Sequence, residues 1–194
     1  APDYDTATTS PLTPFEIGSK WGQAWHTRWF HLSAHVPSHL ANIPIALYFD
    51  PGFIGHGDGF QVEATAWRHG QIVHAIQPDR RLIHLDPSPE GIEIEFWIEA
   101  AATPIIAGHE YGYGPTTFGD PATAPIKPTY TLRAAQLVGY DNTINNLAVS
   151  LHALINLGID LTDTTPQRAR IFAALEKCDA VLDPTNVAGT ALLA

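Results

Sequence analysis

The stretch GIEIEFWIEA, residues 91–100, alternates apolar side chains with acidic or aromatic ones. A period of two residues is typical of a β-strand with one buried face. The residues predicted to face a core are Ile92, Ile94, Phe96 and Ile98. Those predicted to face solvent are Glu93, Glu95, Trp97 and Glu99. We therefore expect a half-buried strand here, with a tryptophan and three carboxylates on its outer face.

The same alternation recurs on both sides of this stretch. The further strands that it predicts cover residues 28–36, 43–49, 60–66, 72–73, 80–85 and 130–138. Turn signals separate them, notably Asp50-Pro51-Gly52 and Arg68-His69-Gly70. Short alternating strands with Pro and Gly turns favour a mainly β fold. We expect an antiparallel β-sandwich or jelly roll.

The apolar period changes to that of a helix after residue 140. The first predicted helix has a stripe of Ile144, Leu147, Leu151 and Leu154, and Gly158 is expected to end it. The second begins at Thr165-Pro166, carries a stripe of Ile171, Leu175, Cys178 and Leu182, and stops at Asp183-Pro184. The predicted organisation is an extended arm (1–14), a β-sandwich (15–140), a helical pair (141–185) and a tail (186–194).

Composition restricts the partners. Ten Lys and Arg against 20 Asp and Glu give a net charge of −10 without a basic run, so nucleic acid is not an expected partner. The apolar stretches are shorter than the roughly 20 residues that cross a bilayer, so we expect a soluble protein without a membrane partner. A single cysteine and the lack of a signal peptide favour the cytoplasm. Because the chain starts without methionine, it can be a piece of a longer protein.

Ten histidines raise the question of a metal site. His31 and His35 share a strand face but lie about 13 Å apart, too far to bind one ion. The triplets His56-Gly57-Asp58 and His84-Leu85-Asp86 are common by chance, and Glu93 and Glu95 fit a solvated strand face better than acid/base work. Cys178 fits a packed thiol. We expect no catalytic and no metal-binding residue in this chain, although a cupin-like metalloenzyme built on the histidines stays an alternative.

Tryptophans dominate WGQAWHTRWF, residues 21–30. Exposed rings with polar neighbours would bind sugars, and Trp29 beside His31 or Trp97 beside Glu95 meets that requirement. The alternative to a structural role is therefore a free-standing carbohydrate-binding module that uses Trp25, Trp29 or Trp97. Core or inter-domain packing is the favoured interpretation, above all for Trp21 and Trp25.

The order of the segments resembles one known family. WGQAWHTRWFHLSAHVP is similar to the W-G-x-x-W-x-x-x-W-F-x-x-x-x-x-V-P opening of the N-terminal domain of glycoside hydrolase family 38 α-mannosidases, in their cytosolic and bacterial branch. IALYFDPGFIGHGDGFQVEATAWRHGQIVHAI, IEFWIEAAATPIIAG, YTLRAAQLVGYDNTINNLAVSLHALINL and PQRARIFAALEKCDAVLDP follow in that domain's order. The similarity covers roughly residues 15–185. Thr103-Pro104 and the segment 109–129 depart from it.

The resemblance implies a zinc-dependent retaining α-mannosidase whose zinc and carboxylate nucleophile lie on a catalytic barrel that this chain lacks. The chain alone should be inactive and need no cofactor. The expected partner is the catalytic domain of the same polypeptide, within a homo-oligomer of the full-length protein. A mannoside ligand is expected at the rim of a substrate cleft, to which the long Gly/Pro segment 101–129 contributes Glu110, Tyr111 and Tyr113.

Overall fold

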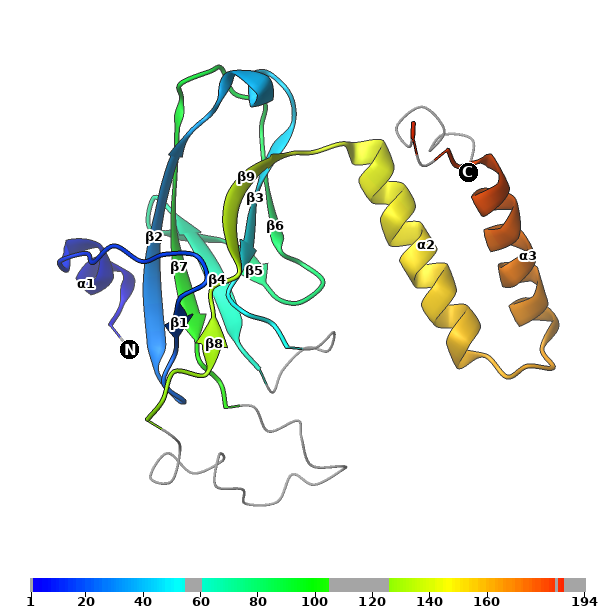
Figure 1. Cartoon of the computed structure of the whole chain (residues 1–194), viewed down its shortest axis with the longest axis horizontal. Helices are drawn as coiled ribbons and strands as arrows, with labels where there is room; N and C mark the ends of the chain where they lie inside the picture. Colours follow the sequence, from blue (N-terminus) through cyan, green and yellow to red (C-terminus); the bar gives the residue numbers. More distant parts are fainter. Residues whose placement is uncertain (1, 55–60, 105–125, 184, 187–194) are drawn as a thin grey trace. The chain divides into compact units, whose positions relative to one another are not determined.

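The computed structural model describes residues 2–54, 61–104, 126–183 and 185–186 (Figure 1). The chain divides into two compact units, Ala1–Gly139 and Tyr140–Ala194. All strands among the described residues belong to the first unit, and the two long helices belong to the second. The mainly β fold with a C-terminal helical pair is therefore confirmed.

One antiparallel sheet has the strand order β2-β7-β4-β5. Its strands are β2 (Thr27–His35), β7 (Glu93–Ala101), β4 (Glu63–Arg68) and β5 (Gln71–Ile76). The cross-strand pairs Phe30–Ile98 and Leu32–Phe96 fix the register of β2 against β7, so the predicted apolar faces meet on one side. The turn between β4 and β5 uses His69 and Gly70, both with positive φ, as a tight hairpin requires.

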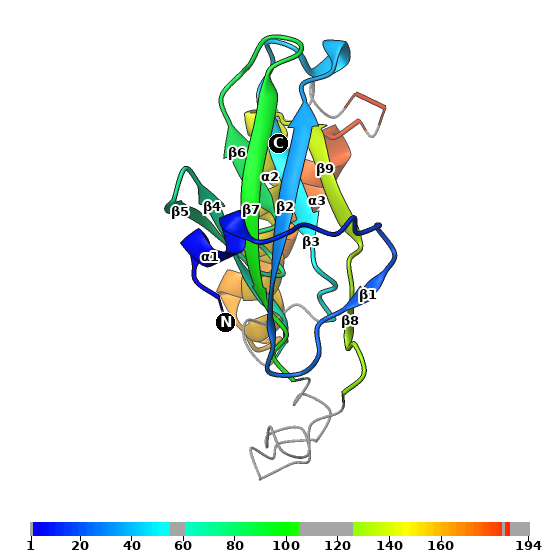
Figure 2. The same ribbon diagram turned by 90° about the vertical axis from the view of Figure 1, so that its left-hand side faces the viewer.

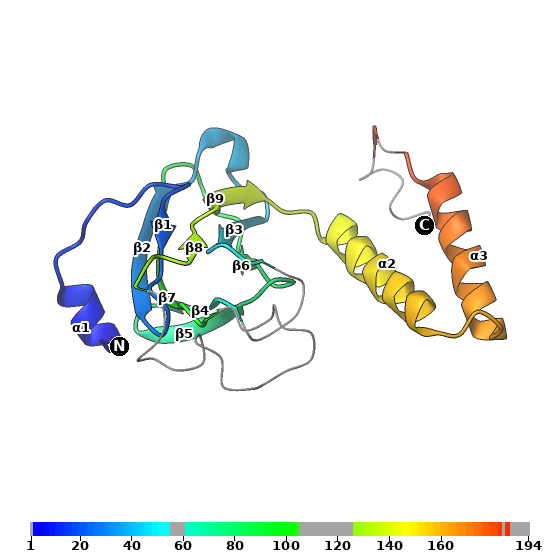
Figure 3. The ribbon, with the colours of Figure 1, turned by 60° about the horizontal axis from the view of Figure 1, so that its bottom comes forward.

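A second sheet has the order β6-β3-β9. Its strands are β3 (Ile45–Asp50), β6 (Leu82–Leu85) and β9 (Ala134–Gly139). The sheets face each other in Figure 3, with β2 and β7 on one side and β3 and β6 on the other. One apolar core contains residues from both sheets, including Phe30, Ile98 and Phe49. The arrangement is the predicted β-sandwich.

Two short strands form a third pairing, β1 (Lys20–Trp21) with β8 (Tyr130–Thr131). The expected single strand over 130–138 is therefore split into β8 and β9. The split falls at Leu132 and Arg133, whose N–H groups donate to the carbonyls of Ser19 and Asp50. These bonds to two different parts of the chain turn the backbone from one partner to the next.

The alternation in 91–100 predicts most, but not all, of the burial in β7. Ile94, Phe96 and Ile98 lie in the core as expected. Ile92 precedes the strand and is 47% exposed, so its predicted burial is wrong. The predicted exposure of Trp97 is also wrong: its side chain is only 7% exposed. Its cross-strand neighbours are His31 and Trp67, whose large rings shield it from solvent.

The N-terminal arm is not wholly extended. Residues Tyr4–Thr9 form helix α1, which begins where the Asp3 carboxylate accepts a hydrogen bond of 2.8 Å from the Thr6 N–H. Ala7 of α1 is buried. The sequence signal was missed because Thr and Asp favour turns as readily as helix starts. A 3₁₀ turn, η1 (Ser38–Leu40), follows β2.

The second unit is a helical hairpin of α2 (Asn142–Asp160) and α3 (Pro166–Val181). Thr165 precedes α3 with Pro166 at its first turn, as predicted. Gly158 does not end α2; the helix continues through it to Asp160. A Cβ there would lie only 3.2 Å from the Phe172 ring, so glycine permits close packing of the two helices. Among the described residues, no helix is long and apolar enough to span a membrane.

Candidate functional site

The outer face of the β2-β7-β4-β5 sheet carries the candidate site. Alternation places two neighbouring cross-strand rows there: Trp29, Glu99 and Thr65 in one row, and His31, Trp97 and Trp67 in the other. Figures 1 and 2 place α1 against this face, outside the sheet. The face therefore combines aromatic rings, carboxylates and an imidazole beneath a short helix.

Three rings form what we call the aromatic cluster: Tyr4, Trp29 and Trp67. The Tyr4 ring of α1 stacks on Trp67, with centroids 5.3 Å apart and planes inclined by 25°. Tyr4 meets Trp29 edge-on at 6.0 Å, and the two indoles lie 5.6 Å apart. These separations are typical of favourable aromatic pairs. The cluster therefore attaches α1 to the sheet.

The indole N–H groups differ in their partners. Trp29 Nε1 donates to the Pro2 carbonyl at 3.0 Å, and Trp21 Nε1 donates to the Pro51 carbonyl at 2.7 Å. Trp67 Nε1 is buried and has no hydrogen-bond partner within the part of the chain that the structure describes. A buried donor without a partner is unusual in folded proteins and requires an explanation.

Polar groups border the cluster. His31 Nε2 lies 2.8 Å from Glu95 Oε1, and the His31 ring packs on Trp97 with centroids 4.6 Å apart. The Ser33 hydroxyl donates to Glu93 Oε1 at 2.7 Å. Glu93 and Glu95 are exposed and bonded to strand β2, as expected for a solvated strand face rather than an acid/base pair.

A groove lies beside the cluster, beneath the irregular segment 11–17. It has a volume of about 700 Å³. Along β2 it is lined by residues 28–32, and Leu132 and Ala135 border it as well. The irregular segment contributes Pro11, Leu12, Thr13, Pro14, Phe15 and Ile17. Arg28 packs over the Phe15 ring at 5.3 Å. The groove follows β2, which is an edge strand of its sheet.

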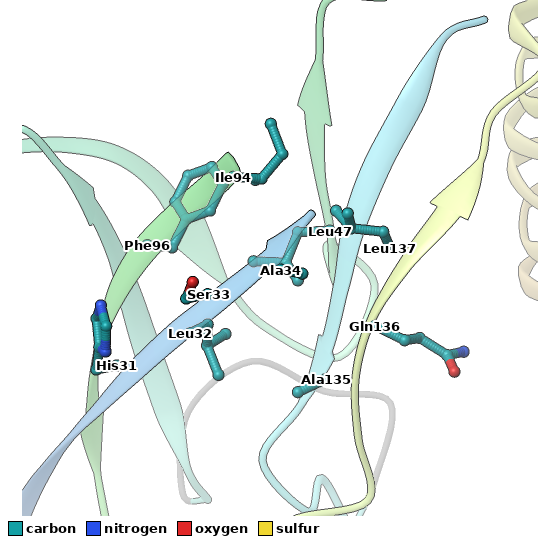
Figure 4. A pocket seen from close by; sticks show the side chains of 10 residues that line it. All are labelled: His31, Leu32, Ser33, Ala34, Leu47, Ile94, Phe96, Ala135, Gln136 and Leu137. Atoms are coloured by element: carbon teal, nitrogen blue, oxygen red, sulfur yellow. The ribbon is translucent and has the colours of Figure 1, made fainter. Parts of the chain in front are cut away.

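A smaller cavity of about 170 Å³ opens between β2 and β9, the edge strands on that side of the sandwich. Apolar side chains from four strands line it, among them Leu32, Leu47, Phe96 and Leu137 (Figure 4). Gln136 extends away from these side chains in Figure 4. The cavity offers apolar contacts but no cluster of polar groups, so it fits poorly as a catalytic pocket.

The two tryptophans that precede β2 have different environments. Trp21 is buried in the core against Phe30 and Tyr130, as predicted. Trp25 is 45% exposed and has a φ of 70°, so it does not belong to the core. Neither Trp29 nor Trp97 presents an open ring face as a sugar platform requires, because Trp29 lies under α1 and Trp97 is buried.

The remaining candidates are the candidate metal ligands, the cleft-rim residues and the cysteine. Among the described residues, no three His, Cys, Asp or Glu side chains converge as metal ligands would. His56 and Asp58 lie outside the described residues, and so do Glu110, Tyr111 and Tyr113, whose role at a cleft rim stays a prediction. Cys178 is buried in α3, as expected for a packed thiol. The described part of the segment 101–129 begins with Ala101 in β7 and buried Ala102.

One buried ion pair is structural. Asp50 accepts hydrogen bonds from the Gly52 and Phe53 N–H groups at 2.8 and 3.1 Å and from Arg81 Nη1 at 2.7 Å. These contacts hold the turn after β3 against the start of β6. The turn is predictable from Asp50-Pro51-Gly52, but Arg81 is not predictable as its partner because it lies in a different segment of the chain.

The site residues that sequence analysis missed are Tyr4 and Trp67. Trp67 lies on an alternating strand, so its outward direction was predictable, but Tyr4 precedes every recognised strand. Contact between them depends on where the arm crosses the sheet, and no local pattern encodes that.

Taken together, the two facing sheets and the aromatic outer face define a jelly-roll β-sandwich domain. A family model described as the α-mannosidase jelly roll domain matches residues 1–138. The match covers more than half of the 194-residue chain, so the chain belongs to this family. It confirms the resemblance to the N-terminal domain of an α-mannosidase. A search of curated proteins gave no match.

Proposed function

We propose that this chain is the non-catalytic N-terminal domain of a glycoside hydrolase family 38 α-mannosidase. The observation that carries the proposal is the family match over the whole β-sandwich. The resemblance supplies the rest: hydrolysis of terminal α-mannosides, and the zinc ion that it requires, belong to a catalytic domain of the same polypeptide. The domain has a structural role in the full-length homo-oligomer. The single cysteine supports a cytoplasmic location.

The helical pair supplies the surface for that structural role. Within α2, Ala148, Ile155 and Ile159 follow each other at intervals of seven and four residues, which places them on one side of the helix. Ile159 is 66% exposed, and Ile155 is exposed as well. The stripe that faces α3 includes Leu151 and Gly158 and borders the exposed stripe, because Leu151 lies one helical turn before Ile155. The exposed stripe is available to pack against the catalytic domain.

Substitutions in this stripe test the proposal. In the full-length mannosidase, Ile155→Glu together with Ile159→Glu should lower zinc-dependent turnover of an aryl α-mannoside, because carboxylates at a packed interface lose their hydration. Asn146→Glu, which adds a charge at an exposed position of the same helix, is the matched control. The circular dichroism of the 194-residue chain should be unchanged in all variants.

Two results would contradict the proposal. One is zinc-dependent turnover by the 194-residue chain alone, which would place the catalytic residues within it. The other is full activity and unchanged subunit assembly in the full-length protein that carries both glutamates.

A further inference from the structure

The aromatic cluster has the composition of a ligand site but is occupied by the chain's own helix. We propose that Trp29 and Trp67 form a saccharide-binding face that α1 covers, so that Tyr4 and a mannoside compete for the ring face of Trp67. The inference rests on the proposed function only for the choice of mannoside as the sugar. It is independent of the docking surface on α2.

The Tyr4 ring occupies the position that a sugar ring would take. It lies nearly parallel to the Trp67 indole, at 5.3 Å between centroids and 25° between planes. The apolar C–H face of a pyranose packs on an indole in the same parallel manner. The Pro2 carbonyl, which accepts the Trp29 N–H at 3.0 Å, occupies the place of a sugar hydroxyl.

The fit of α1 to this face is incomplete. Trp67 Nε1 is buried there without a partner among the described residues. An indole N–H only donates, so it needs an acceptor, and a hydroxyl of a bound sugar supplies one. The unpaired donor distinguishes this face from the core around Trp21, whose indole N–H has its partner.

The attachment of α1 is also limited. The side chains of Thr8, Thr9 and Ser10 donate to the backbone of α1 itself, not to the sheet. Among the described residues, one hydrogen bond joins residues 2–10 to the sheet, the bond that Trp29 Nε1 donates to the Pro2 carbonyl. A helix of six residues is unstable by itself, so α1 depends on the packing of Tyr4 and Ala7. A cover of this kind can be displaced.

The surrounding groups favour a neutral polyol. Glu99 lies between Trp29 and Thr65 in the sheet, and the His31–Glu95 pair lies at the other end of the face. Carboxylates repel anionic ligands but accept hydrogen bonds from hydroxyls. The neighbouring groove of about 700 Å³ reaches Trp29 and His31 and is large enough for a small saccharide.

Variants that remove the Tyr4 ring from the face of Trp67 test the proposal in the 194-residue chain. The probes are methyl α-D-mannopyranoside and α-mannobiose, titrated while tryptophan fluorescence is followed. In the unmodified chain Tyr4 covers Trp67, so the conformation that binds the sugar is rarely populated. Tyr4→Ser should therefore bind the mannosides about tenfold more tightly than the unmodified chain. Tyr4→Phe keeps the stacked ring and should behave like the unmodified chain.

A second substitution locates the site. Trp67→Leu, added to Tyr4→Ser, should abolish the gained binding, while circular dichroism verifies that both variants remain folded. The proposal is overturned if Tyr4→Ser binds no more tightly than Tyr4→Phe, or if binding survives the loss of Trp67. Binding of tetramethylammonium in place of the mannosides would also overturn it, because the face would then be a cation site. None of these results bears on the mannosidase activity of the α2 variants, so the two proposals fail separately.

Discussion

The Asp50 carboxylate is 3% exposed and accepts three hydrogen bonds. Asp50→Ala would leave two backbone N–H groups and the Arg81 guanidinium without their acceptor. We expect the free energy of unfolding to fall by about 3 kcal/mol, at the lower end for a broken buried pair because Arg81 stays partly exposed. Urea denaturation of the 194-residue chain measures this.

Asp50→Asn serves as the comparison, because its amide oxygen still accepts from one or both turn N–H groups while the charge on Arg81 is left unpaired. Asp50→Asn should lower the free energy of unfolding clearly less than Asp50→Ala does. If both variants denature at the same urea concentration as the unmodified chain, the turn does not depend on this carboxylate.

The buried phenol of Tyr130 makes the free energy of unfolding depend on pH in the alkaline range. Burial raises the pKa of its phenol from 10.0 to about 12, and the hydroxyl donates to the Thr103 carbonyl. In the unfolded chain the phenol ionises near pH 10, whereas in the folded chain it keeps its proton. The stabilisation that Tyr130 contributes is therefore complete below pH 10 and is lost as the pH rises toward 12.

Tyr130→Phe keeps the aromatic ring but removes the hydroxyl group that ionises. At pH 7 it should lower the free energy of unfolding by about 1 kcal/mol, the usual value of one hydrogen bond. This difference in the free energy of unfolding should shrink as the pH is raised from 9 to 11. Ionisation of the phenol stabilises the unfolded state of the unmodified chain, whereas the phenylalanine variant has no phenol to ionise. Urea midpoints at each pH measure the difference, and a constant deficit would contradict the assignment.

Gly158 controls the approach of α2 to α3. A leucine there would meet the Ile171 and Phe172 side chains, within 3.3 Å already at its Cβ. We expect Gly158→Leu to force the helices apart at a cost of about 1–3 kcal/mol. Cys178, buried in α3 and the sole cysteine, reports the change: its thiol should react faster with a disulfide reagent.

Ala153→Leu is the matched control for this substitution, because Ala153 is exposed on the same helix. The thiol reactivity of that variant should equal that of the unmodified chain. Equal reactivity of Gly158→Leu would show that the helices do not need their close contact at this position.

Local patterns predicted the long elements because each carries its own periodicity. Alternation identified β2, β3, β4 and β7, and helical spacing identified α2 and α3. The missed pieces lack such a signal: β1 and β8 are two residues each, and α1 is six residues without an apolar stripe. Gly158 was misassigned because a glycine at a helix end and one at a helix contact look alike in sequence.

The candidate site was harder to predict than the elements that carry it. The outward direction of Trp29 followed from alternation, but the covering of that face did not. Trp97 was predicted to be exposed because alternation reports direction and not what lies above a side chain. Tyr4 packs against Trp67 across more than 60 positions of sequence, so their contact is a property of the tertiary fold.

The two units differ in what stabilises them. Every residue of the apolar core lies in the first unit, and its members come from both sheets. Among the described residues of the second unit, only Gly158 and Cys178 are buried. A two-helix hairpin that buries so little cannot offset its chain entropy. The sandwich should therefore fold without the helices, whereas the helices should not fold by themselves.

Separate expression of residues 1–139 and 140–194 checks this expectation. The first fragment should keep a cooperative urea transition, with a free energy of unfolding within about 1 kcal/mol of the value for the same unit in the complete chain, since its core is intact. The second fragment should show the weak, non-cooperative helical signal of a marginal peptide. A cooperative transition in the isolated helices would mean that their exposed apolar stripe is not what limits their stability. Docking of that stripe on a catalytic domain would then have no physical basis.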